Sequence, residues 1–164
     1  MITTTQQQLE INSSPSISYK LKIHALSHYD IVIYPNLIQI SFMAENYKDV
    51  NKKRIINKTC LIIRKNSNTA TKTISVIDND AETIYYSSDG YRTRNFDELF
   101  KILYPSIQNI YRNNRIIKSL KKQKRFNPKS DIKIMTRFNT EIKFHEDEKR
   151  ASKRLLKNTL FNLF

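Results

Sequence analysis

Hydrophobic and polar residues alternate along much of the first half of this chain. The apolar residues Ile17, Tyr19, Leu21 and Ile23 stand at every second position, which is typical of a β-strand with one buried face. A short apolar run at residues 31–34 ends at a proline and predicts a second strand. The chain is therefore expected to enter its fold through two strands.

Three more short segments are rich in β-branched and aromatic residues, and clusters of Asn, Asp and Ser separate them. They span residues 59–65, 71–78 and 82–87. Because parallel strands need long crossover connections, these short spacings predict an antiparallel meander. Around residues 41–47 the apolar spacing approaches that of a helix, so a helix is predicted there.

The second half of the chain is predicted to be mainly helical. Asn95 opens a capping box ahead of an apolar stripe, and the helix that follows is expected to stop at Pro105. A second helix is predicted from Ser106 to about Lys122. Period-two alternation in residues 131–144 indicates a strand or hairpin, and an amphipathic helix is expected from residue 146 to the end.

These patterns predict an α+β fold. A small central antiparallel sheet is expected to be flanked by helices, with an extra N-terminal strand and a C-terminal helical extension. The predicted organisation is a flexible arm at residues 1–15 and one domain at residues 16–126. A strand and an amphipathic helix at residues 127–164 are expected to pack on that domain or to extend from it.

Composition excludes several kinds of chemistry. The single glycine, Gly90, is incompatible with phosphate loops and dinucleotide-binding turns, which need several glycines. The single cysteine, Cys60, excludes an intrachain disulfide and is expected to be an inert core residue. His24, His28 and His145 lack the partners of a metal site, and no arrangement suggests an activated nucleophile. We therefore expect no metal, no cofactor, no transmembrane segment and no catalytic residue.

Positive charge is the strongest bias of the chain, with a formal net charge of +14. Such a charge attracts polyanions, although a chain rich in Lys, Asn and Ile is also typical of AT-rich coding sequence. Seven basic residues lie on one predicted helix and its exit: Arg112, Arg115, Lys118, Lys121, Lys122, Lys124 and Arg125. They indicate either a solvated helix face or a polyanion-binding surface, as in a basic nucleic-acid-binding or ribosome-associated protein.

A second candidate site is the end of the apolar run Leu61-Ile62-Ile63, where Arg64 precedes a loop rich in amides and hydroxyls. A guanidinium held on a strand and facing spare donors suits a phosphate, because it can form a bidentate pair. The alternative is a solvated arginine at the end of a strand.

The predicted order of helix, three antiparallel strands and helix, with Leu61-Ile62-Ile63-Arg64 on the first of these strands, resembles the SH2 domain. That family carries the signature Phe-Leu-Val-Arg-Glu-Ser at this place. Residues 73–76 and 96–104 are similar to its next strand and its second helix. The resemblance covers residues 40–104 and is to divergent members, such as the SH2 domains of bacterial effectors, including those of Legionella.

The resemblance implies a non-enzymatic module, an SH2-like domain at residues 16–126, that binds phosphotyrosine on a partner protein. Arg64 would hold the phosphate, with Asn66, Ser67 and Asn68 donating from the loop and Thr73 lining the floor of the pocket. The lone cysteine suits reducing surroundings, so a cytoplasmic protein is expected, whereas the resemblance to bacterial effectors implies secretion into a host cell.

Overall fold

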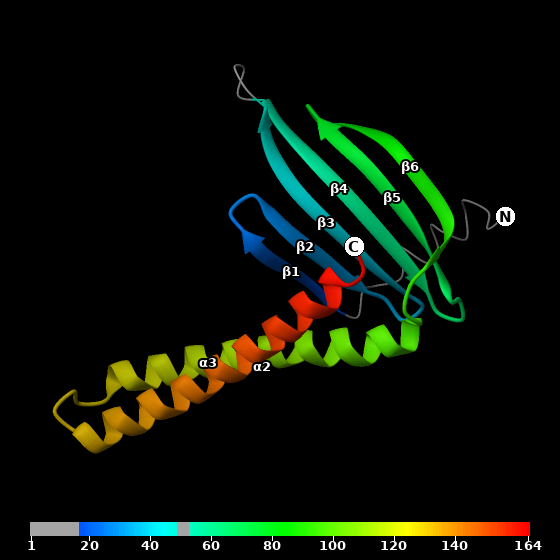
Figure 1. Ribbon diagram of the computed structural model, residues 1–164. Helices are drawn as coiled ribbons and strands as arrows, with labels where there is room; N and C mark the ends of the chain where they lie inside the picture. Colours follow the sequence, from blue (N-terminus) through cyan, green and yellow to red (C-terminus); the bar gives the residue numbers. More distant parts are fainter. Residues whose placement is uncertain (1–16, 49–52) are drawn as a thin grey trace. The chain divides into compact units, whose positions relative to one another are not determined.

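The computed structural model describes residues 17–48 and 53–164, which form six β-strands followed by two long helices (Figure 1). The strands are β1 (Ile17–His24), β2 (Ser27–Ile33), β3 (Leu37–Lys48), β4 (Lys53–Arg64), β5 (Thr69–Asp78) and β6 (Ala81–Arg92). The helices are α2 (Phe96–Phe126) and α3 (Ile132–Phe161). The predicted α+β class is confirmed. The predicted N-terminal arm, residues 1–15, lies outside the described residues.

The six strands form one antiparallel sheet in the order β1-β2-β3-β4-β5-β6. Each strand pairs with its neighbours in sequence, as short turns between strands allow. The predicted antiparallel meander is thus confirmed, with β4 and β6 longer than expected.

The two faces of the sheet differ in chemistry because side chains alternate along each strand. The register aligns Ile31 of β2 with Ile40 of β3, and Ile40 with Leu61 of β4, and all three side chains are fully buried. On the opposite face Ser41 lies beside Cys60, and its hydroxyl donates to the Cys60 sulfur at 3.5 Å. The sheet therefore has one apolar face and one polar face.

The helix predicted around residues 41–47 is wrong, because this segment lies within strand β3. Seven residues are too few for their apolar spacing to decide between helix and strand. Pairing with β2 on one side and β4 on the other decides it, and the Tyr29 and Phe42 rings meet across the first pair with centroids 5.1 Å apart. The strands β4, β5 and β6 and helix α2 follow in the predicted order.

The start of α2 is confirmed, but its predicted interruption at Pro105 is wrong. The Asp97 N–H donates to Asn95 Oδ1 at 2.7 Å, as expected for an N-cap. The helix then continues through Pro105 to Phe126. Its buried residues Leu99, Leu103, Ile107 and Ile110 recur every three or four positions, so burial of this stripe outweighs the missing hydrogen bond of the proline. The two predicted helices are therefore one.

The strand or hairpin predicted at residues 131–144 is also wrong, because the segment begins α3. Asp131 caps this helix by accepting a hydrogen bond from the Ile134 N–H at 3.2 Å. Ile134, Phe138 and Ile142 are four residues apart, which is the spacing of a helix. The apolar pattern of this segment therefore fits a helix as well as a strand. Phe138 and Ile142 then pack with residues of α2 in one cluster.

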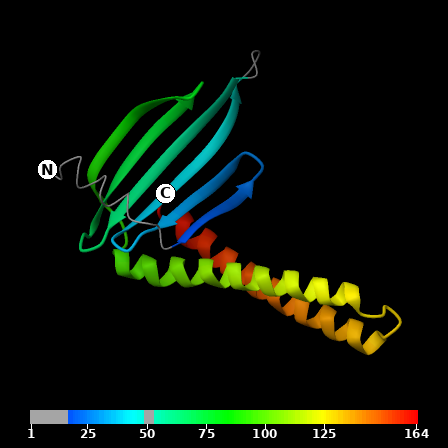
Figure 2. The same cartoon turned by 180° about the vertical axis from the view of Figure 1, so that it is seen from behind.

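α2 and α3 lie side by side and antiparallel, as both views show (Figure 2). Asn109 Nδ2 donates to Ser152 Oγ at 2.8 Å, and His145 Nδ1 lies 2.8 Å from Asn113 Oδ1. Nearer the turn, Lys124 Nζ donates to Asn139 Oδ1 at 2.6 Å. We call this pair of helices, from residue 102 onward, the hairpin.

The chain divides into two compact units, one up to Lys101 and one from Ile102 to Phe164. The first contains the sheet and the first turns of α2, and the second is the hairpin. The boundary predicted at residues 126–127 falls at the end of α2, within the second unit. Neither α2 nor α3 is long and apolar enough to cross a membrane.

Candidate functional site

The predicted phosphate-binding arginine, Arg64, is the last residue of β4 and is half-buried. Its Nη1 donates to the Thr71 hydroxyl at 3.0 Å, and that hydroxyl donates to Asp89 Oδ1 at 2.6 Å. Thr71 and Asp89 were not among the predicted site residues. A carboxylate at the end of this chain of hydrogen bonds opposes a phosphate, because like charges repel at short range.

The other predicted phosphate-binding residues lie in the β4–β5 turn and in β5. Asn66 has a positive φ of 67° and lies in the turn. The Ser67 hydroxyl donates to the Thr69 carbonyl oxygen at 3.0 Å and accepts from the Thr69 N–H at 3.2 Å, so it closes the turn. Asn68 is exposed, and Thr73 lies in β5 opposite Cys60. These hydrogen bonds are those of a tight hairpin turn.

All seven predicted basic residues of the polyanion site lie on α2. Six are exposed and Lys124 is half-buried. With 3.6 residues per turn, Lys118, Lys121 and Arg125 share one side of the helix, and Arg112 and Arg115 lie on another. The structure therefore separates the predicted set into two groups.

Lys121 and Arg125 of the first group, together with Lys124, meet α3 at a hollow of about 630 Å³, which we call the basic hollow. Five basic side chains line it: Lys121, Lys124 and Arg125 from α2, Lys129 from the turn and Lys143 from α3. Met135, Asn139 and Ile142 form its less polar part, and Glu146 is the one carboxylate that lines it among residues 17–48 and 53–164. Glu146 Oε1 lies 3.6 Å from Lys121 Nζ. The hollow thus concentrates positive charge from three parts of the chain.

A row of lysines on α3 continues from the basic hollow, and the sequence prediction missed it. Lys149, Lys153 and Lys157 are four residues apart, so they share the face on which Glu146 borders the hollow. Burial and the charges of Lys149 and Lys157 lower the pKa of Lys153. The spacing of four is visible in the sequence, but the prediction considered only the apolar stripe of this helix and the acidic residues at its start.

The second group of predicted residues lines another hollow of the hairpin, of about 750 Å³. Arg112 and Arg115 border it together with Gln108, Asn109 and Tyr111 of α2 and Ser152 of α3. Arg112 Nη2 donates to Asn109 Oδ1 at 2.9 Å. This hollow offers amide and guanidinium donors with little of the lysine charge of the first.

The sheet carries a hollow of a different kind on its polar face, of about 440 Å³. Lys20, Asp30, Gln39 and Lys58 are among its lining residues. Lys20 Nζ lies 3.9 Å from Asp30 Oδ1, and Lys58 Nζ lies 4.0 Å from Glu82 Oε1, so both cations have acidic neighbours. Within residues 17–48 and 53–164, no cluster of three His, Cys, Asp or Glu side chains is placed to hold a metal ion.

Charge is divided unevenly between the two units of the chain. Residues 102–164 contain 16 basic and 5 acidic residues, a net charge of +11. Residues 1–101 contain 13 basic and 10 acidic residues, a net charge of +3. Most of the positive charge therefore belongs to the hairpin, where the basic hollow and the lysine row lie.

Comparisons with known proteins give no family assignment. No protein-family model matches the chain, and neither the curated proteins nor the solved structures include a match. The fold and the basic surfaces of the hairpin are thus the findings on which a function is argued.

Proposed function

We propose that this protein binds nucleic acid through one side of the α2–α3 hairpin. The observation that carries the proposal is the basic hollow, where five basic side chains from two helices and a turn surround one carboxylate. Phosphate contacts by Lys and Arg supply most of the sequence-independent affinity of nucleic-acid-binding proteins, because each contact releases a condensed counterion.

The shape of the charged surface favours a linear polyanion. Lys149 and Lys157 are separated by about 12 Å along α3, at 1.5 Å per residue, and the row continues from the basic hollow. A polymer with regularly repeated phosphates can contact the hollow and the row together. Lysine is a point charge on a flexible stem, so such contacts hold the backbone and carry little base specificity. We therefore expect binding that tolerates changes in base sequence.

The second hypothesis is phosphotyrosine binding by Arg64, as the SH2 resemblance implies. The position of Arg64 at the end of a strand and its bond to Thr71 support this hypothesis. The carboxylate of Asp89 weighs against this hypothesis. It accepts a hydrogen bond from Thr71, the residue that Arg64 contacts, so it holds a negative charge near the place where the phosphate would bind. The larger positive charge and the open basic hollow make the hairpin the better-supported site.

The test compares two sets of lysine substitutions that remove equal charge. One variant carries Lys121→Gln, Lys124→Gln and Lys143→Gln in the basic hollow, and its control carries Lys22→Gln, Lys53→Gln and Lys65→Gln on the sheet unit. Binding to a fluorescent oligonucleotide is measured by anisotropy between about 50 and 200 mM salt. For a duplex, each lysine–phosphate contact contributes about −0.9 to the slope of log affinity against log salt concentration. Without three such contacts, the slope of the hollow variant is expected to be shallower by up to about 2.7.

The control variant is expected to keep the slope of the unmodified protein. Equal slopes for the two variants would contradict binding through the hollow. A phosphotyrosine peptide that binds more tightly than its unphosphorylated form, with a preference that Arg64→Ala abolishes, would favour the second hypothesis. The two hypotheses are thus separated by different variants and different ligands.

A further inference from the structure

The turn of the hairpin exposes two large apolar side chains. Phe126, the last residue of α2, is 80% exposed, and Ile132, the first residue of α3, is 79% exposed. Asp131 holds the turn in place, because its carboxylate accepts from the Ile134 N–H at 3.2 Å and its carbonyl oxygen accepts from the Met135 N–H at 3.1 Å. Phe126 and Ile132 therefore lie at an ordered end of the hairpin.

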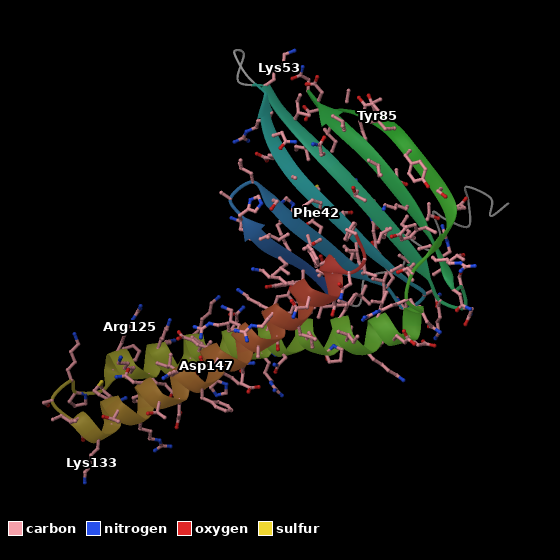
Figure 3. All side chains as sticks on the ribbon, in the orientation of Figure 1. Phe42, Lys53, Tyr85, Arg125, Lys133 and Asp147 are labelled. Atoms are coloured by element: carbon pink, nitrogen blue, oxygen red, sulfur yellow. The ribbon has the colours of Figure 1, made fainter. Side chains whose placement is uncertain are left out.

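Basic residues are frequent in the chain segments next to these two apolar side chains. Residues 121–137 contain seven basic residues and one acidic residue: Lys121, Lys122, Lys124, Arg125, Lys129, Lys133, Arg137 and Asp131. Figure 3 shows Arg125 and Lys133 pointing away from the hairpin on opposite sides of this end. Arg137 Nε lies 3.1 Å from Glu141 Oε1 and Lys121 Nζ lies 3.6 Å from Glu146 Oε1, and Asp131 adds the charge of its capping carboxylate. The seven basic residues still outnumber these three carboxylates.

We propose that this end of the hairpin docks on the surface of an anionic lipid bilayer, with Phe126 and Ile132 inserted among the acyl chains near the headgroups. The basic residues around them contact lipid phosphates and carboxylates. Apolar side chains next to Lys and Arg are the combination that holds peripheral segments at such an interface, because burial and electrostatic attraction act together. This role goes beyond nucleic-acid binding: it adds the apolar side chains at the end of the hairpin and shares Lys121, Lys124, Arg125 and Lys129 with the basic hollow.

A bilayer fits both apolar side chains better than a nucleic acid does. A base stacks on an aromatic ring, so Phe126 alone would serve in nucleic-acid binding, and Ile132 would gain little. The helical spacing also places Phe126 away from the side of α2 that lines the basic hollow. A lipid interface accepts an aromatic and an aliphatic side chain together.

The chain contains no tryptophan, so Phe126→Trp supplies a single fluorescent reporter at this end. With vesicles of phosphatidylcholine and phosphatidylserine, its emission is expected to shift to the blue and to become protected from acrylamide. With vesicles of phosphatidylcholine alone, the emission is expected to stay unchanged, because the electrostatic attraction is missing. Unchanged emission with both kinds of vesicle would overturn the proposal.

Sedimentation with the anionic vesicles tests the side chains themselves. The double variant Phe126→Ser and Ile132→Ser is expected to bind at least roughly tenfold more weakly, from the loss of apolar burial. The matched control is Phe161→Ser, since Phe161 is 78% exposed at the far end of α3. Phe126→Leu is expected to keep binding, because an aliphatic side chain also inserts. Equal binding by the double variant and by Phe161→Ser would contradict insertion.

A nucleic-acid contact at this end would give a different pattern. Oligonucleotide would then quench the Phe126→Trp emission without a blue shift, and Phe126→Leu would weaken single-strand binding while Ile132→Ser would not. That pattern, in the absence of vesicle binding, would overturn the lipid proposal. Nucleic-acid binding through the basic hollow is judged separately by the Lys121, Lys124 and Lys143 substitutions, so either proposal can fail alone.

Discussion

Glu146 is the residue that most directly limits the positive charge of the basic hollow. Its carboxylate lies 3.6 Å from Lys121 Nζ, and the two side chains are 42% and 55% exposed. An ion pair this exposed contributes little to stability, because solvent screens it. In the presence of a polyanion, however, the same carboxylate repels phosphate and occupies a lysine that would otherwise contact it.

We predict that Glu146→Gln strengthens nucleic-acid binding. The change frees Lys121 and removes a negative charge from the hollow, so affinity at low salt is expected to rise roughly two- to fivefold. The measurement is oligonucleotide anisotropy at about 50 mM salt. Glu148→Gln removes the same charge from an exposed residue of α3 that does not line the hollow, and it is expected to have a smaller effect. A weaker or unchanged affinity for Glu146→Gln contradicts the prediction.

At the scale of the element, α3 carries like charges that destabilise it. Lys149, Lys153 and Lys157 repel one another across successive turns, and the pKa of Lys153 is lowered first by burial and then by the charges of Lys149 and Lys157. A helix surface selected only for stability would alternate opposite charges at this spacing. Bound phosphates would relieve the repulsion, so the lysine row is consistent with a surface that works in contact with a polyanion.

We predict that Lys153→Gln stabilises the protein and weakens nucleic-acid binding. Removal of two like-charge pairs is expected to add roughly 0.4–1 kcal/mol to the free energy of unfolding at neutral pH. The folded pKa of Lys153 lies below its ordinary value of 10.5. At a pH between the folded and the unfolded pKa of Lys153, the unfolded chain binds more protons than the folded protein. The free energy of unfolding of the unmodified protein therefore rises with pH, and the stability difference between it and Lys153→Gln becomes smaller.

Urea denaturation at neutral and at alkaline pH measures this effect, and oligonucleotide anisotropy measures the accompanying loss of affinity. A destabilised Lys153→Gln variant at neutral pH would show that the lysine row is not under electrostatic strain. High salt provides an internal control, because screening should reduce the stability difference between the two proteins.

Helix α2 has its own weak point at Pro105. Proline has no N–H to donate to the carbonyl of Lys101, four residues earlier, and the boundary between the two compact units lies at Lys101 and Ile102. We predict that Pro105→Ala restores this hydrogen bond and raises the free energy of unfolding by about 1–3 kcal/mol.

Amide exchange at residues 102–106, measured together with urea denaturation, is expected to slow in Pro105→Ala. The control is Pro128→Ala, because Pro128 lies in the turn outside both helices and its replacement restores no helical hydrogen bond. The same stability for Pro105→Ala and the unmodified protein would show that the surrounding helix already compensates for the proline.

At the scale of the whole molecule, the two units differ strongly in charge, with +3 for residues 1–101 and +11 for residues 102–164. Nucleic acid is therefore expected to protect lysines of the hairpin from acetylation, in particular Lys121, Lys143, Lys149, Lys153 and Lys157. Lys22, Lys53 and Lys65 of the sheet are expected to react equally with and without nucleic acid. Mass spectrometry of the acetylated peptides measures this, and uniform protection across both units contradicts binding by the hairpin.

Much of the fold could be predicted from local pattern. Alternation identified β1 and the end of β2, and β-branched segments separated by polar turns identified β4, β5 and β6. The prediction of a helix at residues 41–47 failed because β3 is specified by its pairing with β2 and β4, which are not local contacts. The prediction of a strand or hairpin at residues 131–144 failed because short alternating runs also fit a helix. The Asp131 cap and the packing of this segment on α2 favour the helix over the strand.

The candidate site also has one part that the sequence predicts and another that depends on tertiary contacts. The basic residues of α2 are evident from the sequence, since charge and helical spacing are local properties. Their meeting with Lys143 around a hollow depends on the antiparallel packing of α2 and α3, which brings together residues far apart in the chain. The surroundings of Arg64 depend in the same way on the pairing of β4, β5 and β6, because Thr71 and Asp89 lie on the other two strands.

Local sequence pattern is enough to specify the antiparallel character of most of the sheet, the capped start of α2 and the large positive charge. These follow from side-chain alternation, capping chemistry and composition, which act within a few residues. Tertiary contacts were needed to establish that β3 is a strand and that α2 and α3 form one hairpin. They also bring Lys121, Lys124 and Lys143 around one hollow and leave Phe126 and Ile132 exposed at the end of the hairpin. These properties arise from contacts between distant segments, whose partners no local pattern specifies.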